Sequence, residues 1–266
     1  MTFGHEQDAV TVNLINMSDE TWRQLLALPE GSAPPQGPEG ALYGPIAAAF
    51  GQFVLAQVGQ SLDGRVATPS GDARDISGPD GLAHLHRCRA LVDAVIVGEN
   101  TVSCDDPRLS VRLVDGPDPA RVVIDCHGRL SGSEGLFNDG GARVIVFQSA
   151  EARRNQLPNA EIVHLRPSGN GLAPQDMLAA LSGLGLHRVL VEGGARTIAR
   201  FIEAGSVDRL HVAVSPLIIG SGPSGITLPP IERLSSALRP EAQIYSLGSD
   251  ILFDCPLKPA VRPAGQ

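Results

Sequence analysis

Lysine is almost missing from the sequence: among 21 basic residues only Lys258 is a lysine, and it lies near the C-terminus. A buried lysine able to form a Schiff base is therefore not expected, and no GxxxxGK[ST] phosphate loop occurs. An anionic ligand must be bound by arginine, hydroxyl groups or backbone N–H groups. The arginines form no basic stripe of the kind that binds nucleic acid, so no nucleic-acid partner is expected.

Motifs for metals, membranes and secretion are also lacking. The four cysteines are far apart and form no CxxC, and the histidines do not cluster along the chain, so the sequence predicts no metal site. No apolar run approaches the roughly 18 residues of a membrane helix, and the first residues resemble no secretory signal. We therefore expect a cytoplasmic protein with free thiols and no membrane contact.

The N-terminal part differs in composition from the rest of the 266 residues. Residues 17–28 are expected to form a short helix with Ser18 as its N-cap. Residues 29–45 carry five prolines and four glycines and are interpreted as a linker. The predicted organisation is an N-terminal helical segment and linker over 1–49, followed by one domain over 50–266.

In the remaining chain, short apolar runs alternate with helical patterns. Helices are expected at 78–91, 174–185 and 195–205. Strands are expected at 53–58, 94–98, 121–126, 143–148, 161–165, 188–194, 209–220 and 251–255. Continuous Val/Ile runs separated by helices indicate an α/β fold, with a mostly parallel sheet that helices cover on both faces.

Two glycine-containing segments follow strands. Gly193 and Gly194 lie between a strand and a helix, where glycine lets the backbone approach a phosphate and the helix supplies free N–H groups. Taken alone, this motif suits a ligand site and a plain turn about equally. Residues 220–225 match GxGxxG, but Pro223 and later prolines replace the required helix. We interpret that segment as a plain turn or a loop near a ligand.

Two polar segments follow other strands and say little by themselves. Residues 98–101 lead into a charged loop over 104–112, and Ser61–Gly64 follows the first strand of the domain. Taken alone, the first is better explained as a solvated loop, and the second does not distinguish a turn from a ligand site.

In combination these segments resemble one family. SLDGR (61–65), HLHRCRALVDAVIVGENTVSCDDPRLSVR within 76–112, PARVVID (119–125), VLVEGG (189–194) and VDRLHVAVSPLIIG (207–220) occur in that order. Together they are similar to the pyrimidine reductase family of riboflavin biosynthesis, over about residues 50–256. The block T-V-x-x-D-D-P-x-L-x-V-R is the most diagnostic part. The chain resembles the stand-alone members more than the reductase domains fused to a deaminase.

The resemblance implies a dihydrofolate-reductase-like fold, with a mainly parallel central sheet flanked by helices. It implies NADPH as cofactor and a ribosylamino-pyrimidine 5′-phosphate as the small-molecule substrate. Hydride is then delivered to C1′ of the ring-opened ribose imine, which gives the ribitylamino product. The family is commonly dimeric, so a homodimer is expected.

The resemblance also assigns residues. The substrate positions that it implies are Arg89, Leu109, Arg112 and Glu192. The cofactor positions that it implies are Gly59, Thr101, Asp105, Gly193, Gly194, Ala195, Arg196, Thr197 and Ile198. Asp63 and Glu192 are the catalytic candidates, for orienting or protonating the substrate. His127 and Arg129 follow a strand and are candidates for binding the 2′-phosphate of NADPH.

Departures from the family keep other interpretations open. The fused enzymes carry lysine where this chain has Gln57 and tryptophan where it has Asp75. A second interpretation is therefore an NADPH-dependent reductase of the same fold that acts on a pteridine, a folate or a flavin precursor. A third is a nucleotide-binding protein without activity. The sequence does not decide whether the pyrimidine is the diamino or the deaminated form.

Overall fold

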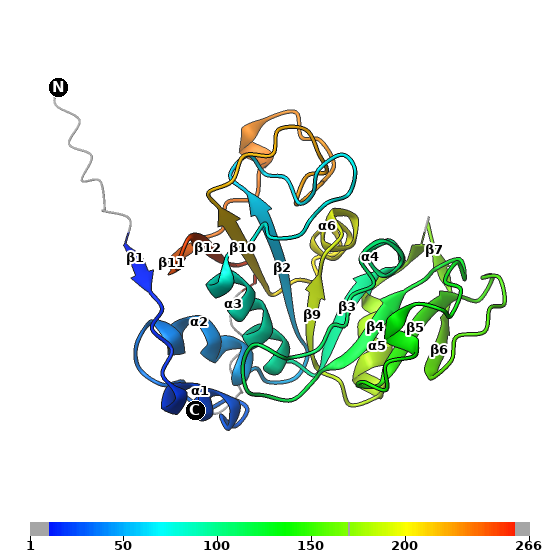
Figure 1. The fold of residues 1–266 in the computed structure, drawn as a ribbon, viewed down its shortest axis with the longest axis horizontal. Coiled ribbons are helices and arrows are strands. Elements are labelled where there is room, and N and C mark those ends of the chain that lie inside the picture. Colours follow the sequence, from blue (N-terminus) through cyan, green and yellow to red (C-terminus); the bar gives the residue numbers. More distant parts are fainter. Residues whose placement is uncertain (1–10, 170, 259–266) are drawn as a thin grey trace.

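A sheet of ten strands forms the centre of the molecule (Figure 1), as seen in a computed structural model that describes residues 11–169 and 171–258. Its strand order is β1-β11-β12-β10-β2-β9-β3-β4-β5-β6. Only the two pairs that β12 makes, with β10 and β11, are antiparallel. The strands are β1 (Val12–Leu14), β2 (Phe53–Ser61), β3 (Ala94–Gly98), β4 (Ala120–Ile124), β5 (Val144–Ser149), β6 (Ala160–Leu165), β9 (Arg188–Glu192), β10 (Arg209–Ser215), β11 (Gln243–Leu247) and β12 (Asp250–Pro256).

Helices cover both faces of this sheet. They are α1 (Asp19–Leu26), α2 (Pro38–Ala47), α3 (Pro79–Ala90), α4 (Glu99–Asp105), α5 (Pro174–Gly183) and α6 (Ala195–Glu203). Short 3-10 turns lie at Gly135–Phe137 and Leu234–Ser236, and a separate two-stranded ribbon joins β7 (Pro167–Ser168) to β8 (Gly171–Leu172).

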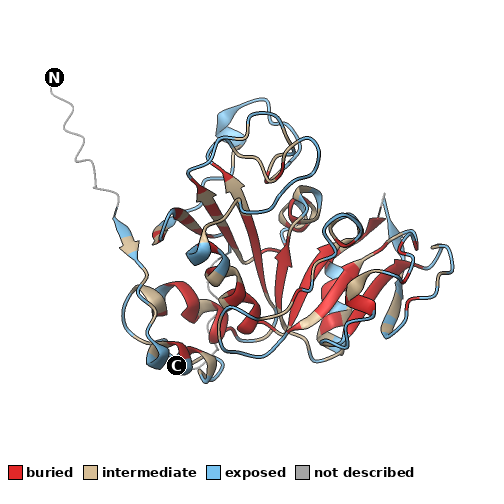
Figure 2. Ribbon diagram, in the orientation of Figure 1, coloured by how far each residue is buried: buried red, intermediate tan, exposed pale blue. Residues whose placement is uncertain are grey.

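Alternation along the strands builds one core on each face. Leu55 of β2 packs with residues of α1, α2 and α3, whereas its neighbours Val54 and Ala56 pack with residues of α5 and α6. Because side chains alternate between the faces of a strand, a strand covered on both sides is apolar at every position. The central strands are accordingly buried along most of their length, while the loops after β10 are exposed (Figure 2). The α/β architecture expected from the sequence is confirmed.

Most of the expected elements are found within a few residues of the expected ends. The strand expected over 209–220 ends at Ser215, because Pro216 has no N–H to donate to a neighbouring strand. The expected elements did not include α4 or β11, which are short and begin in polar segments.

The interpretation of residues 29–45 as a linker is wrong from Pro38 onward, since α2 occupies 38–47. Pro38 stands in the first turn, where the missing N–H costs nothing. The glycines of this helix allow close packing: a Cβ on Gly40 would collide with the Pro35 carbonyl, and one on Gly44 with the Pro34 ring. Glycine and proline therefore serve contact between α2 and the chain before it, rather than flexibility.

The N-terminal segment shares its core with the sheet. Leu25 of α1 and Leu42 and Tyr43 of α2 are fully buried in the same cluster as Leu55 of β2. Trp22 donates a hydrogen bond of 2.8 Å from Nε1 to the Asp115 carbonyl and meets the Tyr43 ring edge-on. The domain boundary at residue 50 stays a prediction, but it does not separate two cores. Among the described residues, no helix combines the length and apolarity that crossing a membrane requires.

The packing of α2 predicts a stability effect. Gly44→Ala is expected to lower the free energy of unfolding by about 1–3 kcal/mol, because the new methyl group overpacks against Pro34. Gly183→Ala in α5 is the matched control, since no atom of the described residues lies within 4 Å of its added Cβ; there alanine is expected to be neutral or stabilising by up to about 1 kcal/mol. Urea unfolding followed by the fluorescence of Trp22 measures both. Equal stability of the two variants would contradict this packing.

Candidate active site

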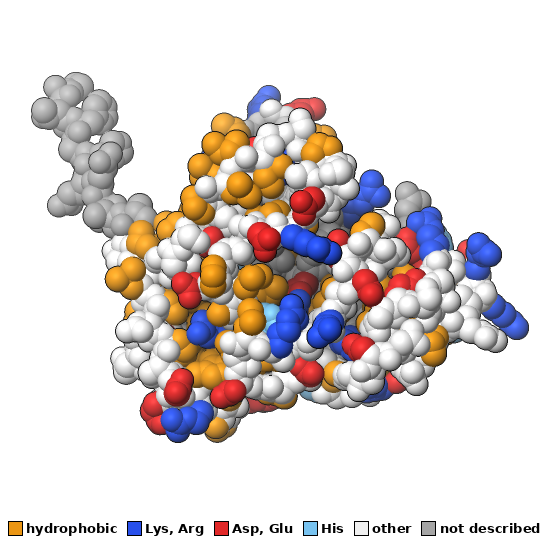
Figure 3. Space-filling view, in the orientation of Figure 1, with side chains coloured by type: hydrophobic (Ala, Val, Ile, Leu, Met, Phe, Trp, Pro, Cys, Tyr) orange, Lys and Arg blue, Asp and Glu red, His pale blue; other side chains and the backbone are white. Residues whose placement is uncertain are grey.

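Four neighbouring parallel strands, β2, β9, β3 and β4, end at the same edge of the sheet. Each ends at small or polar residues: β2 at Ser61 with Asp63 two residues later, β9 before Gly193–Gly194, β3 before Glu99–Thr101 and β4 before Asp125–His127. Because ligands of parallel α/β sheets bind at the carboxyl ends of the strands, this edge is the candidate site. The space-filling view shows a hollow near the middle of the molecule with charged side chains around it (Figure 3).

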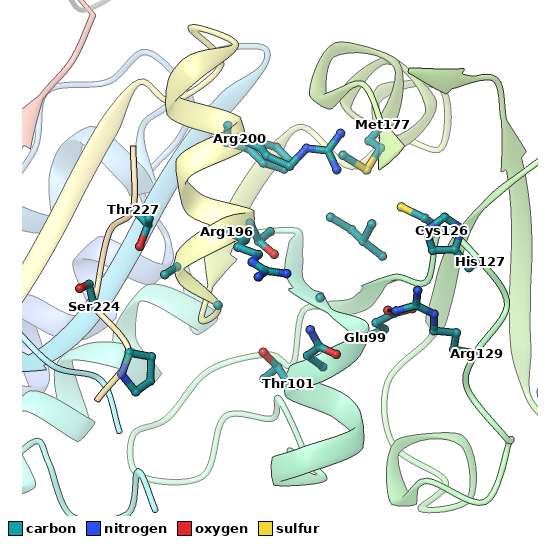
Figure 4. A pocket seen from close by; sticks show the side chains of 18 residues that line it. Glu99, Thr101, Cys126, His127, Arg129, Met177, Arg196, Arg200, Ser224 and Thr227 are labelled. Carbon is teal, nitrogen blue, oxygen red and sulfur yellow. Dashed lines mark hydrogen bonds and ion pairs between the residues drawn. The ribbon is translucent and has the colours of Figure 1, made fainter. Parts of the chain in front are cut away.

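A cavity of about 620 Å³ opens at this edge. Its walls are the turn from β3 into α4, the turn from β9 into α6, the residues after β4 and the loop at 223–227 (Figure 4). Pro223 and Ser224 come from the glycine-rich loop after β10, which Arg65 holds through hydrogen bonds to Gly220, Gly222 and Ser224. That loop thus lines the cavity, and whether it lies near a ligand stays a prediction.

The start of α6 gives the cavity a positive character. Gly193 and Gly194 have φ of 63° and 64°, which glycine adopts without strain, and no side chain caps the helix at Gly194. The positive end of the helix dipole therefore borders the cavity. Arg196 and Arg200 of α6 and Arg129 of the segment after β4 are among its lining residues (Figure 4). These groups favour a phosphorylated ligand.

Glu99 is the one acidic residue among those lining the cavity, and it is paired with Arg129. Arg129 NH1 lies 2.7 Å from Glu99 Oε1, and the Arg129 side chain is 62% exposed. Burial and the neighbouring Asp125 raise the pKa of Glu99, against the lowering effect of Arg129. The pair keeps Arg129 at the rim of the cavity.

The residues expected to bind a cofactor are only partly brought together. Five of them line the cavity: Thr101, Gly194, Ala195, Arg196 and Thr197. Gly193 lies beside them, since a Cβ there would be 3.6 Å from Thr101 Oγ1. Ile198 instead is fully buried in the core, and Asp105 ends α4 on the surface. Gly59 lies within β2, facing Ser77.

Next to the cavity, a buried ion pair joins α3 to β9. Arg89 Nε and NH2 lie 2.7 and 2.6 Å from the two carboxylate oxygens of Glu192, and NH1 donates to the Ser110 carbonyl at 3.0 Å. Both side chains are less than a tenth exposed. Burial opposes the charge on Arg89, but Glu192 outweighs it and raises the pKa of the guanidinium. Guanidinium has five N–H donors, so two remain for a ligand.

Two further arginines extend this region. Arg112 is exposed, and its pKa is lowered first by partial burial and then by the charges of Arg89 and Arg108. Within residues 11–169 and 171–258, neither Arg108 nor Arg112 forms an ion pair. We call Arg89, Arg108 and Arg112 the arginine cluster. Mutual repulsion of this kind is relieved when an anion binds between the charges.

A hydrogen bond to the His86 side chain holds the loop that carries Arg108 and Arg112. His86 Nδ1 accepts the N–H of Arg112 at 3.0 Å, and burial followed by the charges of Arg89 and Arg112 lowers the pKa of His86 to about 4. The imidazole is therefore neutral and can accept this bond. Leu109, an expected substrate position, is 2% exposed and has φ of 55°, a conformation that costs energy for leucine.

Asp63 lies at the end of β2 and is fully engaged. It accepts hydrogen bonds from Ser61 Oγ at 2.5 Å and from the N–H groups of Ile219 and Gly220 at 3.1 and 2.7 Å. These bonds, the one from Ser61 first, lower the pKa of Asp63 to about 2. Asp63 is therefore a carboxylate at neutral pH, and its contacts suit orienting the loop after β10 rather than donating a proton.

The two departures noted in the sequence lie in different surroundings. Gln57 of β2 is paired in register with Glu192, is 6% exposed and has no partner for Oε1 among the described residues. Asp75 lies on an exposed loop with φ of 59°. Sequence reasoning did not find Arg200 or Thr227, which no local motif marks and which only the fold brings to the cavity.

Comparisons with known proteins agree on one family. The model of the RibD C-terminal domain matches residues 52–253. The 2,5-diamino-6-ribosylamino-4(3H)-pyrimidinone 5′-phosphate reductase of Methanothermobacter thermautotrophicus is 34% identical over 216 residues, which are 77% of this chain and 98% of that protein. The riboflavin biosynthesis protein RibD of Aquifex aeolicus is 30% identical over 206 residues, and the chain spans only 56% of its length.

A solved structure supports the same conclusion. It is a diaminohydroxyphosphoribosylaminopyrimidine deaminase/5-amino-6-(5-phosphoribosylamino)uracil reductase from Thermotoga maritima, with a TM-score of 0.65 and 28% identity. The match covers 82% of this chain and 60% of that one. With a family model over residues 52–253 and a relative matched over nearly its whole length, the chain belongs to the RibD C-terminal domain family.

Proposed function

We propose that the protein is a reductase of riboflavin biosynthesis that converts a ribosylamino-pyrimidine 5′-phosphate into the ribitylamino compound, with NADPH as reductant. The diamino form is the proposed substrate, because the archaeal relative that is matched over 98% of its length is named for it. Location in the cytoplasm and assembly as a homodimer stay predictions from the sequence.

The proposal rests mainly on one observation: the arginine cluster and the positively charged cavity at the start of α6 lie on the two sides of the segment from Glu192 to Gly194. Glu192 contacts the arginine cluster, and Gly194, two residues later, lines the cavity at the start of α6. A reaction between two phosphorylated molecules needs two anion sites close enough for the reacting atoms to touch. The segment from Glu192 to Gly194 separates two such sites.

The cavity residues fit a dinucleotide. The N–H groups at the start of α6 and Arg196 suit a pyrophosphate, and Thr101 offers a hydroxyl beside them. When bound, NADPH supplies a hydride that adds to C1′ of the imine. We assign the binding of the adenosine 2′-phosphate to Arg129, which lies at the rim and is held there by Glu99.

The arginine cluster would hold the substrate's phosphate, with Arg108 and Arg112 as its two exposed members, neither of which forms an ion pair within the described residues. Glu192 fixes the guanidinium of Arg89 with both carboxylate oxygens. We therefore assign Glu192 and Asp63 to orientation. Both carboxylate oxygens of Glu192 accept hydrogen bonds from Arg89, and Asp63 has a pKa of about 2. When C1′ accepts the hydride, the attached nitrogen gains a proton. Because Glu192 and Asp63 are assigned to orientation, we assign water as the source of this proton.

Deleting the substrate phosphate tests this assignment. NADPH oxidation is measured with the diamino substrate and its deaminated counterpart, and then with the diamino compound lacking the phosphate. Wild-type protein is expected to turn over the diamino phosphate. Arg112→Ala is expected to lower kcat/KM about 10- to 100-fold, the loss of a charge-assisted hydrogen bond worth about 1.5–3 kcal/mol.

The compound without phosphate is the matched control. Wild-type protein and Arg112→Ala are expected to process it equally slowly, since the partner of Arg112 is already gone. If Arg112→Ala still lost activity on it, Arg112 would not bind the phosphate. If wild-type protein oxidised NADPH with neither pyrimidine while binding NADPH, the substrate would be another heterocycle.

Cofactor preference gives a second test. Arg129→Ala is expected to raise KM for NADPH about tenfold and to leave KM for NADH unchanged, because only NADPH carries the 2′-phosphate. Arg143→Ala is the control, since that arginine pairs with Glu161 outside the cavity. Initial rates with the two nucleotides measure the ratio. An NADPH/NADH ratio unchanged in Arg129→Ala would remove Arg129 from this role.

A further inference from the structure

A second group of reactive side chains lies beneath α3, in the core on the opposite face of the sheet from α6. His84 and Cys88 stand one turn apart on α3 and meet His211 of β10. All three residues are fully buried. The roles assigned above to the cavity and the arginine cluster use none of them.

The three side chains form a small triangle. His84 Nε2 lies 3.2 Å from His211 Nδ1, and Cys88 Sγ lies 3.6 Å from the first nitrogen and 3.9 Å from the second. A tetrahedral zinc ion, with Zn–N of about 2.0–2.1 Å and Zn–S of about 2.3 Å, separates two nitrogen ligands by about 3.3 Å and a nitrogen from a sulfur by about 3.6 Å. The observed triangle has nearly these edges.

The outer nitrogen of each imidazole has a second residue beside it: the Tyr43 contact is a hydrogen bond, whereas the Asp254 contact is an ion-pair distance without hydrogen-bond geometry. Tyr43 Oη lies 2.9 Å from His84 Nδ1, and Asp254 Oδ1 lies 3.2 Å from His211 Nε2. Asp254 is itself fixed by Arg209, whose Nε and NH2 each approach a carboxylate oxygen to 2.5 Å. In metal sites such partners orient the ring and select the nitrogen that faces the ion. Here they leave His84 Nε2 and His211 Nδ1 facing Cys88.

A fourth buried polar residue lies on the strand next to His211. Gln57 of β2 is the registered neighbour of His211 and is 6% exposed. Its Oε1 has no hydrogen-bond partner among the described residues. A buried carbonyl oxygen without a partner costs free energy unless something binds it. A ligand between these side chains would remove that cost.

We propose that His84, Cys88 and His211 bind one zinc-like transition-metal ion, with Gln57 Oε1 or a water that it holds in the fourth position. Two imidazoles and a thiolate are a ligand set that zinc and cobalt share. The ion would tie α3 to β10. Because Arg89 directly follows Cys88, it would also fix the part of α3 that carries the buried pair with Glu192.

The spacing of these residues explains why the sequence predicts no metal site. His84 and Cys88 are four apart on one helix, but the third ligand is 123 residues beyond Cys88, on a strand. No local pattern links them. Without a metal, the same atoms can form neutral hydrogen bonds in which Tyr43 donates to His84 and His84 donates to His211. The experiment must separate these two states.

Cobalt is the probe. Full-length protein is treated with a chelator and titrated with Co²⁺, and the thiolate-to-cobalt charge-transfer absorption is followed. One Co²⁺ per chain is expected, displaced by one equivalent of Zn²⁺ with a rise in the melting temperature. Cys88→Ala is expected to abolish the band. Cys104→Ala is the matched control, an exposed cysteine of α4, and is expected to keep it.

Zinc-edge X-ray absorption of the wild-type protein gives a measurement that needs no variant to fold. One sulfur and two imidazole nitrogens around the zinc are expected. The proposal would be overturned if wild-type protein showed no thiolate band and retained no zinc after dialysis, or if the bound zinc had no sulfur neighbour. It would equally fail if the band persisted in Cys88→Ala, because another thiol would then bind the ion.

Discussion

The buried pair between Arg89 and Glu192 is the interaction on which the arrangement of the site depends. It joins α3 to the end of β9, and two residues later the chain turns through Gly193 and Gly194 into α6. Removing one partner of such a pair leaves a charge buried, at a typical cost of 3–5 kcal/mol. The pair therefore fixes the arginine cluster on one side and the cavity on the other. A reductase needs both sites held at a fixed separation, because hydride transfer requires contact between its two reactants.

A row of polar residues crosses the sheet behind this pair. Asp254, His211, Gln57 and Glu192 are successive registered neighbours on β12, β10, β2 and β9. Polar groups are rare in such cores unless they are bonded or bind a ligand. Arg89 completes one end of the row, and Arg209 the other. The proposed metal site lies in the middle, so that α3 would be anchored to the sheet by an ion pair and a metal ion side by side.

The central sheet could be predicted from the sequence because strands covered on both faces are apolar at every position, as in Ala94–Gly98. The turn after Glu192 could be predicted as well, because the two glycines there suit a turn whose residues both have positive φ. The prediction of a linker was wrong at α2, because Gly40 and Gly44 permit close packing there and do not make the chain flexible. Long-range contacts could not be predicted from the sequence. Asp63 accepts hydrogen bonds from Ile219 and Gly220, and His84 contacts His211, because of how the strands are arranged and not because of any spacing along the chain.

In the proposed reaction, hydride passes from NADPH to the sugar carbon of a pyrimidine phosphate bound by the arginine cluster. The most direct test supplies the diamino pyrimidine phosphate with NADPH that carries deuterium at C4 of the nicotinamide, each C4 position in turn. One of the two labelled cofactors is expected to place a single deuterium at C1′ of the ribityl chain, located by NMR of the product. Deuterium in the pyrimidine ring, or an unlabelled product from both cofactors, would contradict it.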